Sequence, residues 1–244
     1  MMIAKSKGII LRTVKYSETS LILDIFTREL GLKTYIISGV RKKNAKVTLG
    51  MLQPMNILDL VIYNKENTKI NRIKEAQMAY VFKNLLFDIK KSSIALFIIE
   101  IINKSIKEKE TNKEFYDFCE NSLVFLDQTS KNISNFHLIF LIKMSQFLGF
   151  NPISNHSSSN IYFDLREGKF THNIPHHNDF LNEKDSKNLI LVLSVDLEFP
   201  EKIAFSRVDK QNLLKSLILY YKIHLIDFGR IKTLEVFKRV FDSK

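Results

Sequence analysis

Hydrophobic and polar residues alternate with a period of two along the first forty residues of the chain. The apolar runs cover residues 8–14, 20–27 and 32–38. Because successive side chains of a strand point to opposite faces, this period predicts three strands. The segments between them are polar and suit tight reversals, and Gly31 is available for a left-handed turn position.

Two further strand-like runs follow a short link, for which we expect one helical turn. Residues 56–63 place Leu58, Leu60 and Ile62 on one face, and residues 69–79 supply a partner strand with polar interruptions. Three strands, a helical link and a hairpin are the strand order of the OB barrel. The sequence therefore predicts an N-terminal five-stranded OB-fold β-barrel, a fold that binds single-stranded nucleic acid across one face and its loops.

From about residue 81 the apolar residues recur every three or four positions, which is typical of helices. The expected helices cover residues 92–107, 113–127, 134–150, 183–194, 210–228 and 233–241. Residues 151–179 break this pattern with many Ser and Asn, and they contain one predicted hairpin within 161–170. We predict an α+β protein with an OB-fold domain at residues 1–80. A mostly α-helical domain follows at residues 81–244, with 151–179 as an irregular insertion.

The positive charge of the chain is unevenly distributed. The net charge is +11 at pH 7, and residues 1–80 carry 14 Lys and Arg against 6 Asp and Glu. The other 164 residues carry 23 against 20. This asymmetry indicates a polyanionic partner for the N-terminal part. A lysine-rich surface that only faces solvent would give the same numbers, so charge alone leaves both interpretations open.

Cations in the predicted barrel loops are the candidate nucleic-acid ligands, because Lys and Arg neutralise phosphates and release counterions. They are Arg12, Lys15, Arg28, Lys33, Arg41, Lys42, Lys43 and Lys46. Tyr16 and Tyr35 are the candidate stacking platforms. Residues 41–46 are the strongest candidates for nucleic-acid binding, because their charge density has no evident structural purpose. The alternatives are that Tyr35 belongs to the core and that Arg28 is only a turn residue.

No catalytic motif is present. The seven glycines form no phosphate-binding loop, and no Gly-x-Ser-x-Gly motif occurs. Four histidines lie in the insertion: His156, His172, His176 and His177. Pro175 disfavours a helix there, and no cysteine or well-placed acid completes four metal ligands. The lone Cys119 has the helical spacing of a buried small residue. We expect a binding protein, not an enzyme, with no cofactor and no metal.

The longest uncharged apolar run, residues 92–99, is too short to span a bilayer. The first sixteen residues contain no long apolar region of the kind found in signal peptides. We therefore expect a soluble protein.

Short motifs occur in a fixed order near both ends of the chain. They are KGIILRT at 7–13, YSETSLI at 16–22, FTRE at 26–29 with Gly31, VRK at 40–42, LQP at 52–54 and FGRIKTLEV at 228–236. As an ordered set they resemble the RecO family, the recombination mediators of bacterial DNA repair. The resemblance is good over roughly the first 65 and the last 30 residues. Between them it is mostly at the level of the residue pattern.

The resemblance implies a non-enzymatic protein of DNA repair and homologous recombination. Such a protein binds single- and double-stranded DNA and anneals single strands. With its partner RecR it helps to load RecA onto single-stranded DNA that is coated by single-strand-binding protein (SSB). The implied location is the bacterial cytoplasm, in association with the nucleoid. Many members carry a four-cysteine zinc site where this chain has residues 151–179, which contain no cysteine, so we predict no zinc here.

The SSB tail, which the resemblance implies is acidic with an apolar end, would suit a groove rimmed by Lys or Arg in the helical domain. The candidates are Lys222, Arg230, Lys232, Lys238 and Arg239. Solvated charges at helix ends are the alternative for each of them. For the whole protein, the main alternative is an OB-fold RNA-binding or translation-associated protein. A structural adaptor for an acidic protein and a metal-dependent nuclease are the other two.

Overall fold

The structure is a computed structural model that describes residues 2–42, 45–65, 68–106 and 111–242, without the side chains of residues 238, 239, 241 and 242. The chain forms two compact units, Met1–Gln128 and Thr129–Lys244. We name them the barrel unit and the helical unit. The predicted domain boundary near residue 80 stays a prediction, and the compact units group the first two helices with the barrel.

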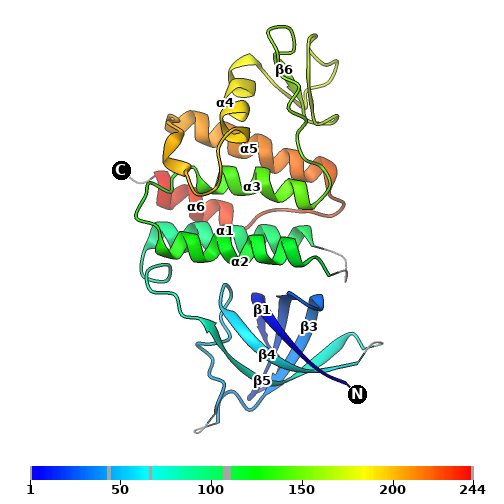
Figure 1. Cartoon of the computed structure of the whole chain (residues 1–244), viewed down its shortest axis with the longest axis vertical. Helices are drawn as coiled ribbons and strands as arrows, with labels where there is room; N and C mark the ends of the chain where they lie inside the picture. The colour runs from blue at the N-terminus through cyan, green and yellow to red at the C-terminus, as the bar shows by residue number, and fades with distance from the viewer. Residues whose placement is uncertain (1, 43–44, 66–67, 107–110, 243–244) are drawn as a thin grey trace. The chain divides into compact units, whose positions relative to one another are not determined.

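Five strands of the barrel unit close into a barrel in the order β1-β2-β3-β5-β4, drawn in blue to cyan in Figure 1. They are β1 Met2–Lys15, β2 Ser20–Thr27, β3 Gly31–Ser38, β4 Ile57–Asn64 and β5 Ile70–Tyr80. Neighbouring strands are antiparallel except β3 and β5, which are parallel. This is the strand order of the OB barrel. The predicted α+β fold class, with an N-terminal OB-fold barrel followed by helices, is confirmed.

Strand β1 turns the corner of the barrel at Gly8. Its first half pairs with β4 and its second half with β2, and Gly8 itself faces both Thr27 and Leu58. A Cβ atom at Gly8 would lie 2.6 Å from Ile25 Cγ2 and 2.9 Å from Leu60 Cδ1. Only a residue without a side chain fits this close approach of three strands.

The alternation predicted for the strands is visible in their burial. Leu58, Leu60 and Ile62 point into the barrel core, whereas Asp59 between them is exposed. Along β5, Asn71 and Ile73 are buried while the neighbouring cations face outward. Burial of these apolar side chains is the main force that holds the barrel together.

Two helices of the barrel unit pack against the barrel. They are α1 Ile89–Ser105 and α2 Lys113–Gln128. The ring of Phe26 on β2 lies 5.4 Å from that of Phe115 and 5.5 Å from that of Tyr116, both on α2. Asp88 caps α1 by accepting hydrogen bonds from the backbone N–H groups of the first helical turn.

Asp127, near the end of α2, fixes the segment that leaves the barrel. Its carboxylate is buried and accepts hydrogen bonds from the backbone N–H groups of Lys83, Asn84 and Leu85 and from the Tyr80 hydroxyl, at 2.7–3.2 Å. Burial alone would raise the pKa of Asp127, but these hydrogen bonds outweigh it and lower the pKa. One carboxylate thereby accepts hydrogen bonds from three consecutive backbone N–H groups of this turn.

The helical unit contains four α-helices, a short 3₁₀ helix and a small three-stranded sheet. They are α3 Phe136–Phe147, β6 Tyr162–Asp164, β7 Lys169–Thr171, β8 Phe180–Leu181, α4 Glu183–Leu193, η1 Pro200–Lys202, α5 Arg207–His224 and α6 Thr233–Asp242. The predicted hairpin of the insertion is present as β6 and β7, and β8 adds a strand that we did not predict. Figure 1 shows α3 and α5 in green and orange and the sheet near the label of β6.

Helix α5 is shorter than predicted. It ends at His224 instead of residue 228, because Leu225 takes an extended conformation and Asp227 has a positive φ of 57°. Phe228 is nevertheless buried, and its ring lies 5.4 Å from that of Tyr221. The apolar side chain of Phe228 extended the predicted helix, but it packs in the core from a segment beyond the end of α5.

Candidate nucleic-acid interface

The loop between β3 and β4 presents cations on an anchored backbone. Val40 is buried in the barrel core and Val47 packs against that core. Gly39 has a positive φ of 80°, and its N–H group donates to the carbonyl of Thr19, 2.9 Å away. The loop is therefore attached at both ends by apolar contacts and held to the β1–β2 turn by a hydrogen bond.

The described basic side chains of this loop point to solvent. Arg41, Lys42 and Lys46 are exposed, and Lys43 lies outside the described residues. On β5, Arg72 is exposed as well. Within the described part of the chain, none of the four described cations forms an ion pair or a side-chain hydrogen bond. We name Arg41, Lys42, Lys46 and Arg72 the open cations.

A pocket of about 450 Å³ opens beside this loop, where β3 and β5 separate. The two strands are paired only from Thr34 to Ile36 on β3 and from Ile70 to Arg72 on β5. Ile37 and Ile73 follow these pairs and line the pocket together with Val40. We name this cavity the seam pocket.

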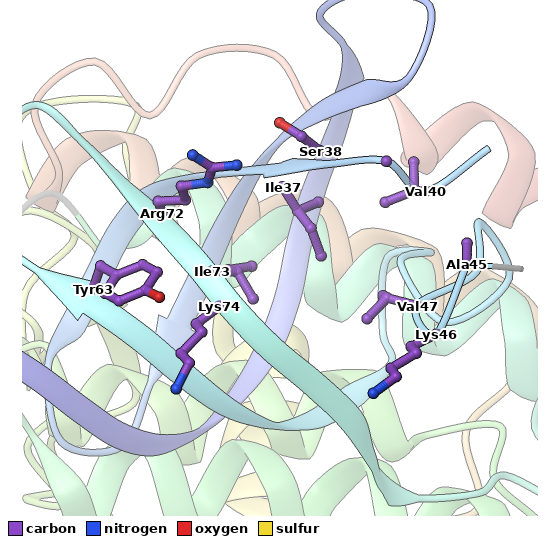
Figure 2. Close-up of a pocket in the computed structure, with 11 residues that line it drawn as sticks. Ile37, Ser38, Val40, Ala45, Lys46, Val47, Tyr63, Arg72, Ile73 and Lys74 are labelled. Carbon is purple, nitrogen blue, oxygen red and sulfur yellow. The ribbon is translucent and has the colours of Figure 1, made fainter. Parts of the chain in front are cut away.

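Cations and one tyrosine surround the seam pocket. Figure 2 shows Arg72 and Lys74 on β5, Tyr63 on β4 and Lys46 on the loop around it. Tyr63 and Arg72 are cross-strand partners, so their side chains leave the sheet on the same face. A second hollow of about 480 Å³ lies on the other side of this pair and includes Lys65 of the β4–β5 loop. The linings of the two hollows share Tyr63 and Arg72, and each hollow has at least one lysine in its lining.

A third hollow, on the β1–β4 side, has a different electrostatic character. It is lined by Lys5, Lys46 and Lys74, but also by Asp59 and Glu75. Carboxylates among the cations make it a poor site for a polyanion. Among the described residues, no carboxylate lines the seam pocket or the second hollow, although Lys74 pairs with Glu75, 3.5 Å away.

Several predicted ligands are engaged in contacts within the protein. Arg28 binds Asp117 of α2 with two hydrogen bonds of 2.6 and 2.8 Å, which lower the pKa of Asp117. Arg12 pairs with Asp24 at 2.6 Å. Lys33 donates to the side-chain oxygen of Asn64, 3.3 Å away. We leave Arg28 out of the proposed interface, because DNA binding there would have to compete with Asp117.

The prediction that Tyr35 is a stacking platform is wrong. Tyr35 lies on the inner face of β3 and is 0% exposed, so no base can reach its ring. Burial raises the pKa of its hydroxyl to about 12. Tyr16, in the β1–β2 turn, is 63% exposed, and the neighbouring Lys15 is exposed too.

Three residues that surround the seam pocket on β4 and β5 are not among the predicted ligands: Tyr63, Arg72 and Lys74. The signal was present in the period of β5, where Asn71 and Ile73 alternate with the two cations. We described these cations only as polar interruptions of a strand. Outward-facing cations on a barrel strand are as well placed for phosphates as those in loops.

The predicted partner-binding residues fall in the C-terminal part of the helical unit. Lys222 is exposed on α5, and Lys232 is exposed between α5 and α6. Arg230 forms an ion pair with Glu235. The side chains of Lys238 and Arg239 lie outside the described residues.

The insertion is held together by hydrogen bonds and ion pairs. Asp164 accepts hydrogen bonds from the backbone N–H groups of Arg166 and Glu167 at 2.8 and 3.1 Å, and its other oxygen lies 3.2 Å from His177 Nε2. Arg166 in turn pairs with Asp179 at 2.7 Å. In the described ranges, no group of three or more His, Cys, Asp or Glu side chains is placed to hold a metal.

Family models cover nearly the whole chain. The model of the N-terminal part of recombination protein O matches residues 1–82, and that of its C-terminal part matches residues 86–233. The chain belongs to the RecO family. It is 37% identical over 243 residues to the DNA repair protein RecO of Flavobacterium psychrophilum, which covers 97% of this chain and 98% of the relative. It is 32% identical over 240 residues to that of Phocaeicola vulgatus, covering 98% and 100%.

Membership of the RecO family assigns the protein a role in DNA repair and recombination. The family is one of recombination mediators and is not known as a family of enzymes. The zinc site that many RecO proteins carry does not fit this chain, because residues 151–179 contain no cysteine. Among the described residues, no helix is both long and apolar enough to cross a membrane.

Proposed function

We propose that this RecO protein is a non-enzymatic recombination mediator. It binds single- and double-stranded DNA through the barrel, anneals complementary strands and, with RecR, loads RecA onto single-stranded DNA coated by SSB. The single observation that carries the DNA-binding part is the set of open cations beside the seam pocket. No carboxylate partner of these four cations occurs among the described residues, in contrast to Lys7, Arg12 and Arg28, which each have one.

The physical basis of annealing is electrostatic. Two DNA strands repel each other through their phosphates, and a cationic surface that binds both lowers this repulsion. Lys46 of the loop and Arg72 of β5 both line the seam pocket. Arg41 and Lys42 belong to the same loop as Lys46. We propose that the loop and β5 together form the surface on which the strands meet.

The partner contacts belong to the helical unit in this proposal. An acidic SSB tail would bind near Lys222 of α5 and Lys232, both of which are exposed. The protein would act in the bacterial cytoplasm, in association with the nucleoid. RecR and RecA would meet the complex on the DNA.

The first experiment measures binding of a labelled oligonucleotide over a salt series. A variant with Arg41, Lys42, Lys43 and Lys46 changed to Ala should bind more weakly, with a salt slope reduced by roughly 2 to 3, since each phosphate contact contributes about 0.7 to the slope for single strands. The control variant changes three lysines, Lys83, Lys90 and Lys113, which are exposed elsewhere in the barrel unit, and the losses are compared per charge removed. Equal losses in both variants would contradict the assignment to the loop.

The mediator activity needs a second experiment. Complementary strands coated with SSB should anneal faster with the protein than without it, and the loop variant should lose this effect. Tighter binding of a structured RNA than of single-stranded DNA would instead favour an RNA-binding role.

A further inference from the structure

The seam pocket combines an apolar floor with a charged rim. Its floor consists of Ile37, Val40 and Ile73, each about 5% exposed. These residues belong to the barrel core, and they line a cavity because β3 and β5 stop pairing just before them. A phosphate group gains nothing from such a floor, since it is strongly hydrated and polar.

A nucleobase matches both parts of this cavity. Its flat apolar faces suit the floor, and the phosphates on either side of it would lie at the rim. The volume of about 450 Å³ falls within the roughly 300–1,000 Å³ that is usual for small-ligand sites. Tyr63 offers an aromatic ring at the same rim, next to its cross-strand partner Arg72.

We propose that the seam pocket holds one unstacked base of a single DNA strand, with Arg72 and Lys46 contacting the flanking phosphates. This inference rests on the proposed DNA binding by the barrel and specifies its substrate. In a duplex the bases are paired and stacked inside the helix, so a duplex presents only phosphates to this surface. The seam pocket therefore distinguishes single strands from duplexes, while the loop cations bind both.

The second hollow indicates the route of the bound strand along the barrel. It shares Tyr63 and Arg72 with the seam pocket and continues to Lys65 and Thr68 of the β4–β5 loop. A strand that places one base in the seam pocket would pass the tyrosine ring and lay its next nucleotide in this hollow. The strand thus follows β5 rather than crossing the barrel.

The test compares three probes in anisotropy titrations at fixed salt: an oligothymidine, an abasic strand of the same length and a duplex. The native protein should bind the oligothymidine about tenfold more tightly than the abasic strand, because base contacts of this kind are worth about that factor. Ala45 lines the seam pocket, and Ala45→Trp should fill it without changing any charge. This variant should bind the oligothymidine and the abasic strand equally, with its duplex affinity retained.

Two controls make the outcome decisive. Ala45→Ser changes the same position without filling the pocket and should behave like the native protein. Tyr63→Leu removes the ring and should weaken binding of the oligothymidine alone; retained duplex affinity shows that each variant is folded. Equal affinity of the native protein for the oligothymidine and the abasic strand would overturn the base pocket but leave DNA binding intact. Absence of binding to all three probes would overturn the proposed function as well.

Discussion

Two groups of cations on the barrel unit have the same chemistry and different surroundings. The paired cations each contact a carboxylate: Lys7 with Glu120, Arg12 with Asp24 and Arg28 with Asp117. The open cations, on the β3–β4 loop and β5, have no such contact among the described residues. Two of the three carboxylates come from α2, about ninety residues or more further along the chain.

This difference shows that Lys and Arg side chains of the barrel have two separate roles. Lys7 and Arg28 help to attach α2 to the barrel, whereas the open cations keep their charge available for a ligand. The pairing also raises the pKa of Lys7 through its hydrogen bond to Glu120. The 14 Lys and Arg of the first eighty residues include both groups, and a count of them cannot separate the two.

The largest effect is expected from a residue that belongs to neither group. Tyr35→Ala should destabilise the protein by about 3–5 kcal/mol, because it leaves a cavity in the barrel core. Urea unfolding measures the change. The matched variant Tyr35→Phe keeps the ring and should bind DNA like the native protein, whereas a loss of affinity in a folded Phe variant would restore Tyr35 as a ligand.

A slightly smaller loss of stability is expected at Asp127. Asp127→Ala should cost about 3 kcal/mol at neutral pH, since it leaves three backbone N–H groups of the linking turn without their acceptor. The folded-state pKa of Asp127 lies below the ordinary value of 3.8. Its contribution is therefore complete above pH 3.8 and is lost as the pH falls through the folded-state value. Unfolding of both proteins at pH 7 and near pH 3 should show the difference shrinking in acid.

DNA affinity should separate the two groups of cations directly. Changing Arg41, Lys42 and Lys46 to Ala should weaken binding at low salt by about thirtyfold or more. Changing Lys7, Arg12 and Arg28 removes the same charge and should weaken it by only about twofold, through the long-range field. If both triple variants lose affinity to the same degree, the pairing with carboxylates has no bearing on binding.

The smallest effect concerns the ion pair itself. Arg28→Gln should raise the pKa of Asp117, because it removes the hydrogen bonds that hold that pKa below its ordinary value. Carboxyl-detected NMR titration of Asp117 follows this change. DNA affinity should stay at the native level, and an unshifted Asp117 would show that the pair does not persist in solution.

Much of the architecture could be predicted from the sequence, because the strands and helices are specified by local periods. The period of two identified the five strands, and their order identified the OB barrel. The helical period does not show where a helix ends when an apolar residue beyond its end is also buried. Phe228, after α5, is such a residue. The period of two also leaves open which face of β3 turns inward, so the sequence predicts Tyr35 as a stacking platform with the core as the alternative.

The site was predictable in part, for a related reason. The charge density of residues 41–46 is local, so the sequence alone predicts this loop as a candidate site. The partners of Arg28 and Lys7 come from α2, and no pattern within the first eighty residues indicates them. The seam pocket depends on where two strands stop pairing, which only the register of β3 and β5 reveals.

Three residue pairs join β3 to β5, whereas eight join β2 to β3 and eight join β1 to β4. The barrel is thus closed by its shortest ladder, and local opening of a fold begins where the fewest hydrogen bonds hold it. Amide hydrogens of this ladder should exchange with solvent sooner than those of the longer ones. A strand of DNA lying along β5 would span this junction and oppose local opening of the barrel there.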